Sequence, residues 1–185
     1  AKLFKEINPQ GMVLTGGMHA TVAPDEMEAV QEFDRICIGP GEKVIVELNR
    51  LGMLVDISHC NEQTTLDACR LSKAPVICTH AGARSVTDRD RNKSDKALKA
   101  IAATGGVVGV TAVGWIIENS KTKGRGVPEF CDHLDHFKKV IGADHVSVAT
   151  DSPLRGWDRL SPHRTSPELS DIGHWKAVAA ELSRR

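Results

Sequence analysis

The sequence predicts an α/β protein built on a parallel sheet of about six strand–helix units. Short apolar runs rich in Val and Ile recur along the chain. Each is nearly continuous rather than alternating, which is typical of strands buried on both faces. Segments with helical periodicity lie between the runs, and strands that alternate with helices favour a parallel sheet covered by helices. We expect strands at residues 12–15, 35–38, 53–57, 75–78, 106–110 and 145–149.

The helices are placed by the same periodicity and by their end signals. Ser94 is a good N-cap for the helix that follows it, and the glycines at 105 and 106 end that helix. Residues 152–171, rich in Pro, Gly and charged side chains, predict a long irregular loop. We expect helices at residues 2–7, 42–51, 62–71, 95–104, 130–141 and 172–184.

The composition is that of an ordinary globular protein. Lys plus Arg equals Asp plus Glu, 24 each, among 185 residues. No overall field therefore favours nucleic acid or an anionic membrane as a partner. No apolar run approaches the roughly 20 residues that a membrane-spanning helix needs. The charged start AKLFKEINPQG does not read as a signal peptide.

The cysteines predict a reduced protein. There are five, and none forms a CxxC pair. An odd number without paired spacing argues against a disulfide framework, so we expect a cytoplasmic location.

Three polar residues stand where strands are expected to end. VDISH ends in His59, VICTH ends in His80, and VSVATD ends in Asp151. The carboxyl ends of parallel strands share one rim of the sheet, which is where α/β folds place their active sites. Imidazoles suit zinc, and a nearby carboxylate can transfer protons. The rim is therefore the predicted site.

Several segments in order resemble the second half of the membrane (renal) dipeptidase family of zinc peptidases. They are LNRLGMLVDISHCNEQTT, SKAPVICTHAGARSV, DRDRN and HLDHFKKVIGADHVSVATD, and the resemblance runs from about residue 48 to the end. It implies a barrel of eight strand–helix units that holds two zinc ions and hydrolyses dipeptides, including some with a D-residue at the C-terminal position. Six strands are two short of that barrel, so we expect a partial TIM-type barrel.

The resemblance also implies roles for individual residues. His59 and His80 match the two histidines that bind one zinc, and Asp151 matches the aspartate that assists the nucleophilic water and proton transfer. Arg91 matches the arginine that pairs with the free carboxylate of the substrate. A guanidinium fork suits such a carboxylate.

The first 47 residues resemble something else. FKEINPQGMVLTGGMHAT and FDRICIGPGEKVIVEL are similar to the later part of a cobalamin-binding, flavodoxin-like domain. The chain then consists of a flavodoxin-like segment, residues 1–47, and a dipeptidase-like half barrel, residues 48–185, in one continuous folded unit. The family's HxD pair and its zinc-bridging glutamate are not recognisable before His59, so His19, Glu42 or Asp56 would have to complete the metal site. Asp56 lies on a strand and is expected to face elsewhere.

The remaining histidines read as weaker candidates. His133-Leu134-Asp135 spells the letters of the family's first zinc motif, but on a helix these side chains point about 200° apart and cannot hold one ion. His163 could line a substrate pocket, whereas His145 begins a strand at the opposite end of the sheet.

Three functions follow from these patterns. The first is a zinc-dependent dipeptidase-like hydrolase, active or inactive depending on its missing ligands. The second is a non-catalytic α/β scaffold, chimeric or vestigial, and the third is a cobalamin-binding module. An open sheet edge could also allow two copies to pair. The sequence leaves open whether the chain is an active enzyme.

Overall fold

The computed structural model describes residues 14–16, 35–37, 41–119, 122–151, 169 and 175–185. The chain divides into two compact units, residues 1–53 and residues 54–185. Among the described residues of the first unit, β1 (Leu14–Gly16) pairs in parallel with β2 (Arg35–Cys37), and α4 (Gly41–Arg50) follows. The expected helix at 2–7, His19 and His163 lie outside the described residues.

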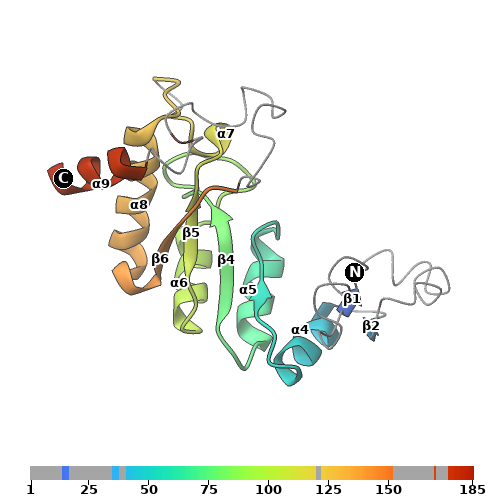
Figure 1. Ribbon diagram of the computed structural model, residues 1–185. Helices are drawn as coiled ribbons and strands as arrows, with labels where there is room; N and C mark the ends of the chain where they lie inside the picture. The colour runs from blue at the N-terminus through green and yellow to red at the C-terminus, as the bar shows by residue number, and fades with distance from the viewer. Residues whose placement is uncertain (1–13, 17–34, 38–40, 120–121, 152–168, 170–174) are drawn as a thin grey trace, which may run out of the picture. The chain divides into compact units, whose positions relative to one another are not determined.

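The second unit is built on a four-stranded parallel sheet (Figure 1). Its strands are β3 (Val55–Asp56), β4 (Val76–Ala81), β5 (Val108–Thr111) and β6 (Val146–Ala149), and they pair in sequence order. The described strands thus form two sheets, of two and four strands, so a single sheet of six units is not confirmed. The α/β class and the parallel pairing are confirmed.

Helices α5 (Glu62–Leu71), α6 (Asp95–Ala103) and α8 (Val127–Ile141) pack side by side, and α6 and α8 contact the sheet. A short α7 (Gly114–Ile117) follows β5, and α9 (Trp175–Arg184) packs on α8. None of the helices in the described residues is long and apolar enough to cross a membrane.

The core of the second unit lies between the helices and the sheet. Phe130 and Phe137 of α8, Leu98 and Ile101 of α6, and Val108 of β5 are fully buried. Burial of this kind stabilises by roughly 1.5–3 kcal/mol for each large side chain. This packing holds the sheet in place, and the loops at the carboxyl ends of the strands extend from it.

Candidate active site

The two predicted histidines meet at the carboxyl ends of β3 and β4. The amide of Cys60 donates to the carbonyl of Ile57 (3.1 Å), which closes a tight turn with Ser58 and His59 at its centre. His80 is the fifth residue of β4. The Nε2 atoms of His59 and His80 lie 3.0 Å apart, and the two rings meet edge to face.

Asp151 and Arg91 approach the same pair. Asp151 follows β6, and its φ of 52° places the backbone in the left-handed region, which Asp tolerates better than most residues. Its Oδ1 lies 3.8 Å from Nε2 of His80. Arg91 comes from the loop after β4, with one guanidinium nitrogen 3.1 Å from Nε2 of His59 and another donating to the carbonyl of Ser58. All four predicted residues are therefore brought together.

A chain of hydrogen bonds behind His80 fixes the state of its ring. The hydroxyl of Thr79 donates to Oδ2 of Asp56 (2.8 Å), which uses its only proton. The same oxygen lies 2.9 Å from Nδ1 of His80 and so accepts the Nδ1 proton. Nε2 is left unprotonated and faces His59. A hydrogen bond of this kind on the far nitrogen orients a metal-binding imidazole.

The sheet explains why these residues meet. Asp56 pairs with Ile77, so Thr79, two residues further along β4, lies on the same face as the carboxylate. Between Cys78 and Ala81, β4 takes three steps while β5 takes two, from Val108 to Val110. The extra residue is a β-bulge, a feature that often re-aims side chains beside active sites.

The charges at the site are set by burial and by these hydrogen bonds. Burial lowers the pKa of His80, and the positive charge of Arg91 lowers it further, although Asp151 opposes both. Burial alone would raise the pKa of Asp56, but the hydrogen bonds from Ser58 and Thr79 outweigh it and the pKa is lowered. At neutral pH the site therefore has a neutral His80 backed by an ionised Asp56.

The histidine pair fits part of a zinc site. Zn–N bonds of about 2.0–2.1 Å at tetrahedral angles put two nitrogen ligands about 3.3 Å apart. The two Nε2 atoms lie 3.0 Å apart, close to that separation, and the guanidinium of Arg91 would have to move away from His59 for a metal to bind there. No group of three or more His, Cys, Asp or Glu side chains within the described residues could hold a metal. Within the described residues the pair thus offers two nitrogen ligands and no third.

Of the candidates for a third ligand, only Asp56 lies in this unit and within the described residues. Asp56 does not join the two Nε2 atoms: its carboxylate faces Ser58 and Thr79 and accepts hydrogen bonds from both. The side-chain alternation along the strand could not reveal this, because it depends on the register between β3 and β4. Glu42 belongs to the first unit.

The other histidines that the structure describes have structural partners. His133 is fully buried, accepts the amide of Ala83 at Nδ1 (2.7 Å) and contacts the hydroxyl of Thr87 at Nε2 (3.2 Å). Asp135 instead binds Arg185 at the surface. The two residues point into different environments, as the helical interpretation predicts. His145 donates from Nδ1 to the carbonyl of Gly106 (2.8 Å).

Sequence reasoning missed the residues behind the site, chiefly Thr79, Ser58 and Lys93. The signal for the first two was a hydroxyl side chain immediately before each predicted ligand, in ISH and CTH. Such hydroxyls commonly pair with a ring nitrogen or a carboxylate. Lys93 gave no signal, because it stands in a charged loop whose path the pattern does not determine.

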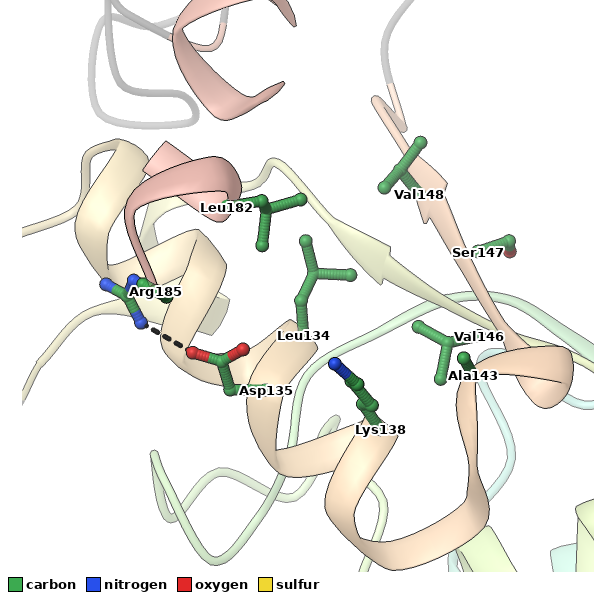
Figure 2. A pocket seen from close by; sticks show the side chains of 9 residues that line it. All are labelled: Leu134, Asp135, Lys138, Ala143, Val146, Ser147, Val148, Leu182 and Arg185. Atoms are coloured by element: carbon green, nitrogen blue, oxygen red, sulfur yellow. Dashed lines mark hydrogen bonds and ion pairs between the residues drawn. The ribbon is translucent and has the colours of Figure 1, made fainter. Parts of the chain in front are cut away.

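A hollow of about 520 Å³ lies elsewhere, between α8, β6 and α9 (Figure 2). Its apolar floor is made by Leu134, Val146, Val148 and Leu182, and the side chains of Arg185 and Asp135 pair at its edge. It contains none of the four predicted site residues.

Comparison with known proteins shows the family of the chain. A sequence profile of the family described as membrane dipeptidase (peptidase family M19) matches residues 23–185. The chain therefore belongs to the membrane dipeptidase family. The match includes residues 23–47, part of the segment expected to be flavodoxin-like, and the resemblance of that segment to a cobalamin-binding domain is not shown.

The curated relatives are dipeptidases by name. Dipeptidase 3 of Mus musculus is 38% identical over 145 residues, and an uncharacterized dipeptidase of Schizosaccharomyces pombe is 37% identical over 118 residues. These matches cover 78% and 64% of this chain, respectively. The chain spans only 28% of the length of each relative.

Solved structures share the fold. The M19 metallo peptidase named dipeptidase AC has a TM-score of 0.67 at 29% identity, covering 78% of this chain and 41% of its own. A metallo peptidase from Rhodobacter sphaeroides has a TM-score of 0.70 at 23% identity, covering 98% of this chain and 52% of its own.

Proposed function

We propose that this chain carries half of a zinc-dependent dipeptidase site, with His59 and His80 as metal ligands. The observation that carries the proposal is the approach of two histidine Nε2 atoms to 3.0 Å at the carboxyl ends of neighbouring strands. The M19 match supports the same reaction class, hydrolysis of the peptide bond of a dipeptide.

The residues around the pair have complementary roles. Asp151, 3.8 Å from His80 and more than a third exposed, accepts a proton from the attacking water and returns it to the leaving amine. Arg91 binds the free carboxylate of the dipeptide through its planar fork of donors. To do so, its guanidinium turns away from His59. Thr79 and Asp56 keep the proton of His80 on Nδ1, so that Nε2 is free to bind a metal.

Zinc, when bound, would polarise the peptide carbonyl and lower the pKa of a water molecule. Catalytic zinc sites usually have three protein ligands, and the described residues supply two histidines. We therefore expect the chain to bind zinc weakly and to hydrolyse dipeptides slowly unless further ligands join the pair.

The test compares the zinc content and dipeptide hydrolysis of the wild-type chain with those of His80→Ala. We expect the wild type to bind zinc measurably in a titration against a chromophoric chelator and the variant to bind it more weakly. His136→Gln is the matched control, because this histidine binds Asp95 on α6 and Gln can keep that hydrogen bond.

Two results would contradict the proposal. A wild-type chain that folds normally without binding zinc would favour the non-catalytic scaffold. Equal zinc content in the wild type and His80→Ala would place any metal elsewhere. Zinc binding without hydrolysis would refute catalysis by this chain alone while leaving the metal site in place.

A further inference from the structure

Lys93 is a buried lysine directly beneath the turn that carries His59. It is 2% exposed. Its ammonium donates to the carbonyls of Ile57 (2.9 Å) and Cys60 (2.8 Å) and to the hydroxyl of Thr65 (3.3 Å). These contacts use all three of its protons, so the buried charge is fully hydrogen-bonded.

The two carbonyls belong to the first and last residues of the turn. Between them, the carbonyl of Ser58 accepts from Arg91, and the amide of Ser58 donates to Asp56 (3.0 Å). Arg91 and Lys93, two cations from one short loop, thus donate hydrogen bonds to three carbonyls of the turn around His59. Ile57 and Ser58 are buried, so their carbonyls cannot turn to water and need donors from the protein.

Lys93 is itself fixed to the strand that carries His80. Its backbone amide donates to the carbonyl of Gly82 (2.9 Å), and its own carbonyl accepts from the amide of Arg84 (2.9 Å). The side chain of Asn92 also accepts the amide of Gly82 (3.0 Å). Gly82 lies two residues after His80, so Lys93 connects the two histidine-bearing segments through a short, rigid path.

We propose that Lys93 is a positioning residue that sets the place of His59 relative to His80. An apolar side chain would fill the same space without the cost of burying a charge, so the ammonium is explained by the carbonyls that it holds. Without it, the turn loses the donors at both ends and His59 moves independently of His80. The metal role of the pair rests on the function proposed above, whereas the fixation of the turn does not.

The experiment uses the full chain with Lys93→Met, which keeps an unbranched side chain and removes the donors. Lys96→Met is the matched control, because Lys96 is an exposed lysine on α6. Zinc affinity is measured by competition with a chromophoric chelator. Hydrogen exchange of the Cys60 amide, which bonds to Ile57, is measured by NMR without metal.

We expect Lys93→Met to exchange the Cys60 amide at least about 10-fold faster than the wild type, since local opening of the turn controls that rate. Zinc affinity should fall about 10–100-fold, the usual effect of losing a residue that orients a metal ligand. Lys96→Met should leave both unchanged. Lys93→Gln, which keeps two N–H donors, should give smaller changes in the same direction and serves if Lys93→Met does not fold.

The outcomes separate the two proposals. If the wild type binds no zinc, the metal function fails, and the Cys60 exchange rate alone decides the role of Lys93. Unchanged exchange in both Lys93 variants overturns the positioning role. Lower stability with wild-type zinc affinity also overturns it, because Lys93 would then support the fold without placing His59.

Discussion

At the scale of single residues, Thr79 has the most direct control over the candidate site. Its one hydroxyl group both donates to Asp56 and accepts from His80. We expect Thr79→Val to lower zinc affinity about 10–100-fold, because the His80 ring loses the partner that fixes its proton on Nδ1. Chelator competition measures the change.

Thr79→Ser is the control for this prediction. Serine keeps the hydroxyl and loses only a methyl group, so its zinc affinity should stay close to that of the wild type. Equal losses of zinc affinity in Thr79→Val and Thr79→Ser would show that the methyl contact matters instead of the hydrogen bond.

A second prediction at this scale concerns pH. Burial lowers the pKa of His133 to about 4, from 6.5 for an ordinary histidine. Between these values the unfolded chain binds more protons than the folded chain, so stability falls as the pH drops from 6.5 towards 4. The loss is on the order of 3 kcal/mol. Denaturant unfolding at a series of pH values measures it.

His133→Asn provides the comparison. Its Oδ1 can accept the amide of Ala83 as Nδ1 does, but the side chain does not titrate in this range. The variant should be less stable overall and show a flatter dependence on pH. An unchanged slope would assign the pH dependence to other groups.

At the scale of elements, the bulge in β4 depends on a glycine in the neighbouring strand. A Cβ added at Gly109 would lie 2.2 Å from the carbonyl oxygen of Thr79. We expect Gly109→Ala to destabilise the protein by about 1–3 kcal/mol, because β4 must shift away. Zinc affinity should fall as well, since the shift moves Thr79 and His80.

Gly41→Ala is the control for Gly109→Ala, because an added Cβ at Gly41 meets nothing within 4 Å. Thermal unfolding and chelator competition test both variants. Wild-type behaviour of Gly109→Ala would mean that the bulge can relax without moving the site.

Local signals predicted the helices better than the strands. Helix α5 spans the predicted residues, and the Ser94 side chain accepts the amide of Ala97 as an N-cap should. Helix α8 begins three residues before the expected start, at Val127, since Pro128 suits a first turn and Glu129 accepts the amide of Gly126 (2.8 Å). Strand β3 is shorter than its apolar run, because a strand needs a paired neighbour along its length.

In the site, too, only the residues with local signals could be predicted from the sequence. Strand-end position alone indicated His59, His80 and Asp151, because parallel strands end on one rim. Arg91 needed the family resemblance, since its loop has no periodicity. Thr79 and Lys93 depend on a bulge and on a loop path, neither of which a single sequence determines.

At the scale of the whole molecule, β6 is an edge strand of the four-stranded sheet that the described residues form. Within the described residues β6 pairs only with β5, and Val148 on β6 is 51% exposed. Unpaired strand edges with apolar side chains promote pairing between chains. We expect the protein to self-associate as its concentration rises and Val148→Lys to weaken this association.

Sedimentation velocity over a concentration series measures the association. Val46→Lys is the control, because Val46 is also exposed (60%) but lies on helix α4. Equal weakening by both substitutions would indicate general apolar contact and not strand pairing.

The hydrogen-bonded network from Asp56 to Lys93 affects how this part of the site can pass from one gene to another. The histidine pair, its proton-fixing partner and the lysine beneath its turn all come from one uninterrupted stretch of strand, helix, strand and loop. A recombination event that carries this stretch would transfer most of the local chemistry together, and Asp151 and any further metal ligand would have to be supplied by the recipient. Descendants could therefore keep the histidine pair intact while exchanging everything around it.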